Sequence, residues 1–325
     1  MMYDLLRPYK PEVDFSVIIS CYFEERSIDI FYTRLSNTLR SMGRSYEIIF
    51  INDGSTDKTF EKLKAIFDAD PNVTAVVDFF KNAGQANAVT PGVLLARGKA
   101  MVFIDSDLQL DPEELPLLAE KYDEGYDIVS GYRKKRQDSL SRKLPSVIAN
   151  IIMRKTSDSN IRDFGCTFKI YDGRLLRAFE FGPFKPWRPV PVIAHAQRIA
   201  EVPLNHHSRQ FGQSGWTFKK LFMYNMENIV NLSEMPFQLL GATCLFIVSL
   251  FLIRIIIGIF FPFSILKQVT GGLLLNIIIV NLLSILSVLT IIGEFVIRNF
   301  IILQRKPAYI IREIYVKGLD HHIYD

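Results

Sequence analysis

The segment "AMVFIDSDLQLDP", residues 100–112, joins a short apolar run to a dense acidic turn. Residues 100–104 have the composition of a buried strand, and Asp105 and Asp107 follow at once with one residue between them. Neighbouring carboxylates raise each other's pKa because like charges repel. The segment therefore predicts a strand followed by a turn in which a positively charged group balances Asp105 and Asp107.

A divalent cation is the counter-charge that keeps two such carboxylates ionised. Mg²⁺ and Mn²⁺ prefer oxygen ligands and commonly bridge carboxylates to phosphates. Gln109, two residues beyond Asp107, adds a carbonyl oxygen. We therefore expect Mg²⁺ or Mn²⁺ at Asp105, Asp107 and Gln109, although an acidic turn after a strand is by itself also a common structural feature.

Apolar runs of this kind recur along the first 132 residues, with gaps long enough for a helix. This spacing is typical of repeated βα units. Asp111 and Pro112 support it, because they suit the N-cap and the first position of a helix. We therefore expect an α/β domain with a mostly parallel sheet and helices on both faces. The predicted strands are 15–20, 46–52, 73–80, 100–104 and 127–132.

Polar residues follow four of these predicted strands, and in open α/β sheets ligands bind beyond the carboxyl ends of the strands. After the second strand, Gly54 permits a sharp turn and Asp53 can accept hydrogen bonds from a base or ribose. The sequence contains neither GxGxxG nor GxxxxGK[ST], so dinucleotide and P-loop sites are not indicated. The polar segments are "SCYFEE" (20–25), "NDGSTD" (52–57), "KNAGQ" (81–85) and "DSDLQLDP" (105–112).

Composition limits the partners and the compartment. The formal net charge is +4, with 38 basic and 34 acidic residues, so no global field indicates nucleic acid. Three scattered cysteines argue against a disulfide framework or a zinc site and favour a reducing compartment. The first 14 residues lack an apolar run before a cleavage-like site, so we expect no signal peptide.

The composition changes after about residue 235. Residues 237–261 carry one charge, Arg254, and residues 272–293 carry none. Each segment is about 30 Å or more as a helix, enough to cross a bilayer. Two buried core helices are the alternative. Polar residues at roughly helical spacing mark a face suited to helix packing: Asn281, Ser284, Ser287 and Thr290.

The flanks of these segments predict their orientation. Basic residues are frequent after the second segment, whereas the connector between the two carries only Lys267, so we expect a cytoplasmic tail and N-terminal domain. Residues 215–236 suit a helix lying in the membrane interface, with a soluble amphipathic helix as the alternative. The basic run at 133–143 is either a solvated loop or a site for anionic lipid or phosphate.

Several short motifs occur in a fixed order along the chain: Tyr22-x-Glu24, "NDGSTD" (52–57), "DSDLQLDP" (105–112), "GYR" (131–133), "RDFGC" (162–166), "HHSRQFGQS" (206–214), "GE" (293–294) and "KPAY" (306–309). In order and spacing, these motifs resemble glycosyltransferase family 2 on a GT-A fold. With two C-terminal spans, the chain resembles polyprenyl-phosphate glycosyltransferases nearly end to end. It is most similar to the branch that transfers aminoarabinose or glucose to undecaprenyl phosphate.

The resemblance implies four parts of the chain: a GT-A catalytic domain (1–214), an interfacial helix (215–236), two transmembrane helices (237–300) and a basic tail (301–325). Asp107 and Gln109 would hold the metal on the diphosphate, and Asp105 would face the ribose or the metal. The nucleotide-sugar site would comprise Ser20, Tyr22, Glu24, Asp53, Lys81, Asp105 and Ser106. Ser20 and Phe23 stand where the family usually has proline and asparagine.

Arg133 and Arg209 resemble the family's phosphate-binding arginines, and arginine suits bidentate phosphate contacts. Asp163 either positions groups or acts as a modest base; a structural cap or ion pair is the alternative. An acceptor phosphate monoester has a second pKa of about 6, so it is largely a dianion at neutral pH and needs little help from a base. Direct attack by it implies inversion at the anomeric carbon.

The expected function is transfer of one sugar from a nucleotide sugar, with UDP the expected nucleotide, to undecaprenyl or a related polyprenyl phosphate. The cytoplasmic membrane face is the expected location, and the product would serve lipid A, O-antigen or other envelope glycans. The resemblance implies a homo-oligomer, with a tetramer as the form to expect. A processive polysaccharide synthase is disfavoured, because QxxRW is absent and only two spans are present. A non-catalytic nucleotide-sugar-binding scaffold is disfavoured because Asp105 and Asp107 are both retained. The sugar stays open.

Overall fold

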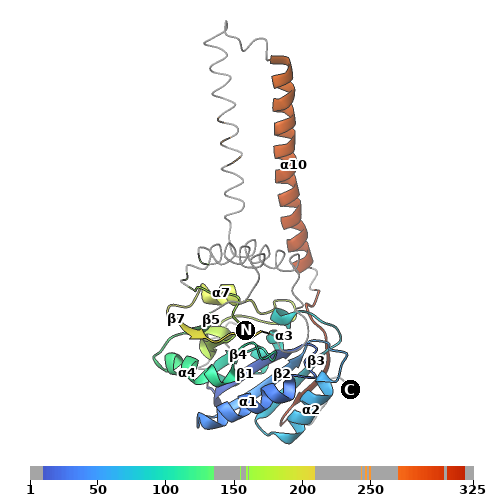
Figure 1. Cartoon of the computed structure of the whole chain (residues 1–325). Helices are drawn as coiled ribbons and strands as arrows, with labels where there is room; N and C mark the ends of the chain where they lie inside the picture. Colours follow the sequence, from blue (N-terminus) through green and yellow to red (C-terminus); the bar gives the residue numbers. More distant parts are fainter. Residues whose placement is uncertain are drawn as a thin grey trace. The chain divides into compact units, whose positions relative to one another are not determined.

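The computed structural model (Figure 1) describes residues 10–134, 161–208, 270–303 and 306–318, with isolated positions 154, 159, 243, 246 and 249. The chain divides into two compact units: residues 1–228 with 307–325, and residues 229–306. Several predictions lie outside the described residues: Arg209, the basic run beyond Lys134, the interfacial helix, and the first span except for its three isolated positions.

The first unit contains an eight-stranded sheet in the order β7-β5-β6-β4-β1-β2-β3-β8. The four strands β1 to β4 pair in parallel, β5 pairs in parallel with β7, and β6 and β8 are antiparallel to their neighbours. This arrangement confirms the predicted mostly parallel α/β sheet. The strands are β1 (Val13–Cys21), β2 (Tyr46–Asn52), β3 (Val73–Phe79), β4 (Gly98–Phe103), β5 (Ile128–Arg133), β6 (Lys169–Asp172), β7 (Ile199–Leu204) and β8 (Ile311–Val316).

Helices cover both faces of the sheet. Alternate residues of β1 enter two separate cores: Phe15, Val17 and Ile19 lie in one, and Ile18 lies in the other. Burial on both faces explains why the central strands read as nearly continuous apolar runs. On one face pack α1 (Ile28–Ser41), α2 (Thr59–Ala69) and α4 (Leu115–Asp123); on the other pack α3 (Gln85–Leu95), α6 (Gly173–Arg177) and α7 (Pro189–Ile193).

The helix start predicted at Asp111 and Pro112 is confirmed. A 3₁₀ helix, η2 (Pro112–Glu114), has Asp111 as its N-cap residue and leads directly into α4. The Asp111 side chain makes no capping hydrogen bond. Its carboxylate is therefore available to side chains from other elements.

The C-terminal segment belongs to the sheet, which the sequence did not predict. β8 pairs antiparallel with β3, so that Ile311 lies opposite Phe79 and Val316 lies opposite Ala75. Just before β8, the buried Tyr309 ring stacks on Phe79 with centroids 4.8 Å apart. The predicted basic tail thus supplies a strand that protects the edge of β3.

The second unit contains α10 (Thr270–Leu303), a helix of 34 residues. Within it, Val280–Ile297 has a mean hydropathy of 2.2, and none of this stretch is buried. Among the described residues, α10 is the one helix long and apolar enough to cross a membrane. The second predicted span, residues 272–293, falls inside it.

We expect Tyr309→Ala to lower the free energy of unfolding of the first unit by about 3 kcal/mol, the usual cost of deleting a buried aromatic ring. Thermal unfolding of the full chain in detergent measures the change. Ile310→Ala is the matched control, because the Ile310 side chain is 58% exposed. Equal midpoints for the two variants would contradict the assignment of residues 309–316 to the core.

Candidate active site

A cavity of about 40 Å³ opens beyond the carboxyl end of β4. Its walls come from the turn after β4, the end of β5, the turn before β6 and the segment after β7. The structure therefore brings Asp105, Asp107 and Gln109, which were predicted from one motif, together with Arg133, which was predicted from another. The lining residues are Asp105, Asp107, Gln109, Leu110, Arg133, Gly165, Cys166, Thr167 and His206.

Asp105 is fixed by two side chains that sequence reasoning did not select. Thr167 Oγ1 donates a hydrogen bond to Asp105 Oδ2 at 2.7 Å, and Gln85 Nε2 donates to Oδ1. Gln85 is the first residue of α3, and Thr167 lies two residues before β6. Asp105 therefore links the start of α3 to the turn before β6 and has little rotational freedom.

The turn at 107–109 has a strained backbone. Leu108 has φ of 58°, a left-handed conformation that costs a non-glycine residue about 1–2 kcal/mol. The Leu108 side chain is buried in the core, and Asp107 Oδ1 accepts a hydrogen bond from Gln109 N at 3.1 Å. These two interactions hold a turn in which Asp107 and Gln109 line the same cavity.

The donor set of this cavity suits a metal that is shared with a phosphate ligand. Asp105, Asp107 and Gln109 offer carboxylate and amide oxygens, as Mg²⁺ and Mn²⁺ prefer. Across the residues that the structure describes, no group of three or more His, Cys, Asp and Glu side chains is placed to hold an ion. Mg²⁺ usually binds through one or two carboxylates together with waters and substrate phosphates, so the residues fit that mode.

Arg133 and Asp163 form a bidentate ion pair beside the cavity. Arg133 Nε lies 2.7 Å from Asp163 Oδ2, and Arg133 Nη2 lies 2.8 Å from Oδ1. Both side chains are largely buried, at 15% and 9% exposed. A Cβ atom at Gly165 would lie 3.2 Å from Arg133 Nη2, so a larger side chain there would crowd the guanidinium. Asp163 thus holds Arg133, which lines the cavity.

The Asp53 carboxylate, which follows β2, holds the turn after β3 in place through hydrogen bonds. Its carboxylate accepts hydrogen bonds from Ala83 N at 2.6 Å, Gly84 N at 3.0 Å and Asn82 Nδ2 at 2.8 Å. Burial raises the pKa of Asp53 to about 6, against the two backbone donors that lower it. Gly54 is required here, because φ is +68° and a Cβ atom would lie 2.5 Å from the Lys81 carbonyl carbon.

The other predicted nucleotide-site residues lie on the neighbouring turns. The Ser20 carbonyl accepts a hydrogen bond from Ser106 Oγ at 3.4 Å, and Glu24 N donates to Thr59 Oγ1 at 2.9 Å. Tyr22 is 44% exposed and Lys81 is also exposed. These side chains are open to a ligand, and their roles stay predictions.

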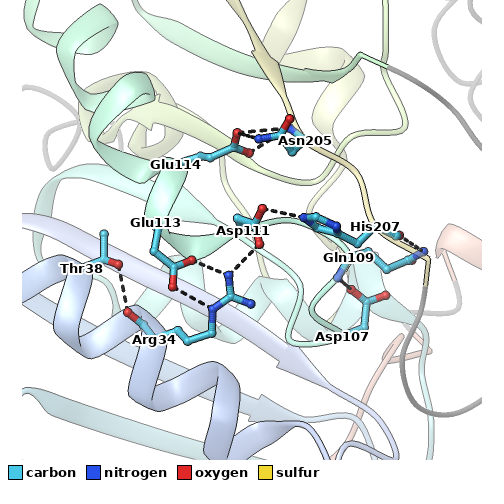
Figure 2. A network of polar contacts seen from close by, with 9 residues as sticks. All are labelled: Arg34, Thr38, Asp107, Gln109, Asp111, Glu113, Glu114, Asn205 and His207. Atoms are coloured by element: carbon cyan, nitrogen blue, oxygen red, sulfur yellow. Dashed lines mark hydrogen bonds and ion pairs between the residues drawn. The ribbon is translucent and has the colours of Figure 1, made fainter.

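A polar network ties the segment after β7, residues 205–208, to the acidic turn (Figure 2). His207 Nε2 lies 2.7 Å from Asp111 Oδ2, and the Gln109 carbonyl accepts from His207 N at 2.9 Å. Arg34 of α1 donates to Asp111 Oδ1 at 2.6 Å. Burial raises the pKa of Asp111, but hydrogen bonds from His207 and Arg34 lower it below the ordinary value.

Two further contacts complete this network: Arg34 also pairs with Glu113, and Glu114 accepts from the Asn205 backbone and side chain. Sequence reasoning missed Arg34, Glu113, Glu114 and Asn205. Their partners lie 77–91 positions away in the sequence, so no local sequence pattern predicts these contacts.

The chain belongs to glycosyltransferase family 2: the family model "Glycosyl transferase family 2" matches residues 16–180. It is 34% identical over 233 residues to the undecaprenyl-phosphate 4-deoxy-4-formamido-L-arabinose transferase of Salmonella typhimurium, covering 70% of this chain and 69% of that protein. The protein of the same name from Klebsiella pneumoniae is 33% identical over 239 residues, 72% of each chain. These findings confirm the predicted family and identify the protein as a glycosyltransferase.

Solved structures show more distant similarity. Glucosyl-3-phosphoglycerate synthase from Mycobacterium tuberculosis, in complex with Mn²⁺ and UDP-glucose, gives a TM-score of 0.49 at 19% identity, covering 67% of this chain and 77% of that one. S. aureus TarS, in complex with UDP-GlcNAc, gives a TM-score of 0.46 at 20% identity. The match covers 68% of this chain and 67% of the TarS chain.

We expect Asp163→Asn to lower kcat about 10- to 100-fold, because Arg133 loses the carboxylate that fixes it. The pH–rate profile should keep its shape, since a positioning residue does not titrate in the reaction. Steady-state rates between pH 5.5 and 9 measure both. Arg162→Gln, an exposed neighbour, is the control. Loss of the acidic limb of the profile would instead identify Asp163 as the base.

We expect His207→Ala to lower kcat/KM about tenfold with little loss of stability, because exposed pairs contribute less than about 1 kcal/mol. The variant removes the side-chain contact between His207 and Asp111, while the backbone hydrogen bond from residue 207 to the Gln109 carbonyl remains. Glu113→Gln is the matched control, because it removes a partner of Arg34 and leaves His207 paired with Asp111. Equal rates for both variants would show that the contact does not position the site.

Proposed function

We propose that this protein transfers a single sugar, with inversion, from a UDP-sugar to undecaprenyl phosphate or a related polyprenyl phosphate at a membrane surface. The observation that carries the proposal is the cavity in which Asp105, Asp107 and Gln109 face Arg133. Oxygen ligands for a metal and a guanidinium for a phosphate lie together there. The relatives named above support the acceptor, and the sugar stays open.

Binding two anionic substrates is the central task of such a site. Asp105, Asp107 and Gln109 would hold Mg²⁺ or Mn²⁺, which when bound would neutralise the donor diphosphate. Arg133, fixed by Asp163, would orient a phosphate at the cavity wall. Arg209, which follows the 205–208 segment in the sequence, would contribute a second guanidinium. The acceptor phosphate is largely a dianion, so the chain needs to align it more than to deprotonate it.

The nucleotide end of the donor would lie over the turns after β1, β2 and β3. Tyr22 offers an exposed ring for the base, and Lys81 offers a cation. Asp53 would act by holding the turn after β3 as well as by any direct contact. The further members of this proposed site are Ser20, Glu24, Asp105 and Ser106.

The path of the chain supports an even number of membrane crossings. β1 to β7 precede α10, and β8 follows it, yet all eight strands form one sheet. If α10 crosses a membrane, the chain must cross again between residues 208 and 270 to return to the same side. The apolar segment 237–261 is long enough to be that crossing.

We further propose that the sheet unit and the tail lie on the cytoplasmic side, because the basic residues flank α10 at its C-terminal end. The proposed catalytic part then comprises residues 1–214 together with β8 of the 301–325 tail. Residues 215–236 would lie in the interface, and the 237–300 helices would associate as a homo-oligomer.

We expect full-length protein in detergent, given undecaprenyl phosphate, Mg²⁺ or Mn²⁺ and a panel of labelled UDP-sugars, to form a lipid-extractable product with one of the donors. Asp107→Ala should lower the rate by about 10²-fold or more, because a proposed metal ligand is lost and the negative charge on the departing diphosphate is then less well stabilised in the transition state. Wild-type binding of UDP-sugar without lipid product from any donor would contradict the transferase and favour a scaffold. Products longer than one sugar would indicate a processive enzyme.

A further inference from the structure

Asp78, at the carboxyl end of β3, is a fully buried carboxylate that the proposed mechanism does not use. Its Oδ2 accepts a hydrogen bond from Arg312 Nε at 2.5 Å, and its Oδ1 accepts from Asn52 Nδ2 at 2.7 Å. A buried charge is tolerated only when it is paired and hydrogen-bonded. Burial raises the pKa of Asp78, and the hydrogen bonds from Arg312 and Asn52 act in the opposite direction by stabilising the carboxylate.

From Asp78, a chain of hydrogen bonds leads to the turn after β1. Asn52 is buried at the end of β2, and its Oδ1 accepts from Ser55 Oγ at 2.6 Å. Ser55 Oγ in turn accepts from the backbone N–H of Phe23 at 3.1 Å. Arg312, Asp78, Asn52 and Ser55 thus form a continuous polar relay that ends on the backbone at Phe23.

The turn at the end of this relay has a strained residue. Phe23 has φ of 57°, which costs about 1–2 kcal/mol for a residue other than glycine, and the ring is 47% exposed. Such a residue persists only where surrounding contacts determine it. The Phe23 ring lies edge-on to Tyr22 with centroids 4.5 Å apart, so the backbone at 23 also sets the Tyr22 ring.

Arg312 reaches this relay from a distant part of the chain. It lies in β8, 234 positions after Asp78, and α10 lies between them. Because β8 runs antiparallel to β3, residues 311 and 312 come to the edge where the β3 carboxyl end and the proposed nucleotide site lie. The far end of β8 contacts the opposite edge, where Lys317 Nζ donates to the Asp70 carbonyl at 2.9 Å.

We propose that Arg312 is a positioning residue for donor binding: through Asp78, Asn52 and Ser55, it holds the Tyr22–Glu24 turn in the shape that receives the nucleotide. The strand that follows α10 therefore sets the affinity of the site for the donor. This inference rests on the proposed function for the nucleotide role of the turn, while the relay itself stands on the contacts.

The experiment compares full-length Arg312→Gln with Lys317→Gln in detergent. Both variants remove one cation from the same C-terminal segment, but only Arg312 contacts the relay. We expect Arg312→Gln to raise the dissociation constant for UDP and the KM for UDP-sugar about five- to tenfold, with a smaller change in kcat. Lys317→Gln should keep wild-type affinity, and Arg312→Lys should restore part of it.

Hydrogen–deuterium exchange of peptides covering residues 20–27 tests the relay independently of activity. Arg312→Gln should speed exchange there, because the relay that positions Ser55, the acceptor of the Phe23 amide hydrogen, loses its contact at Asp78. In an Asp78→Asn background, Arg312→Gln should add little, since both changes act through one route. If Arg312→Gln alone folds poorly, the comparison of Asp78→Asn with the double variant still tests the relay, because neither of them leaves a buried Asp78 carboxylate without its Arg312 partner.

The outcomes separate the two proposals. If the wild type binds no UDP, the proposed function fails, and the exchange data still decide the relay. Equal losses of stability in Arg312→Gln and Lys317→Gln, with unchanged UDP affinity and unchanged exchange at 20–27, would overturn the positioning role.

Discussion

A buried carboxylate must find partners, and this requirement shapes the edge of the sheet where the site lies. Asp53, Asp78 and Asp163 are each nearly or fully buried, and each is held by two or more donors from other segments. The donors come from the turn after β3 for Asp53, from β2 and β8 for Asp78, and from β5 for Asp163. Each acid therefore links its own segment to another part of the chain. At the candidate cavity, the Asp163 carboxylate in this way holds Arg133, which forms part of the wall.

The sequence was a good guide to the parallel half of the fold. A strand that is buried on both faces has an almost continuous run of apolar residues, as residues 46–52 do. β2 occupies the range predicted from that run. β6 and β7 were not predicted. β8 was not predicted either, although "IREIYV" is a plausible strand, because its partner lies more than 230 positions earlier.

For the candidate site, the sequence selected the acidic turn and Arg133, and both line one cavity. It could not reveal how they are held. Gln85 and Thr167 flank Asp105, and Arg34 supports Asp111, through contacts between segments that only the completed topology brings together. The left-handed backbone at Phe23 and Leu108 is similarly invisible, because neither residue type favours it.

The position of β8 also has a consequence for biosynthesis. A ribosome makes residues 311–316 after α10, so the edge of β3 that β8 covers stays unpaired until those residues have been made. An unpaired strand edge invites pairing with other chains. A chain that stops before residue 311 would therefore lack both the strand that covers β3 and the Arg312 side chain that pairs with Asp78.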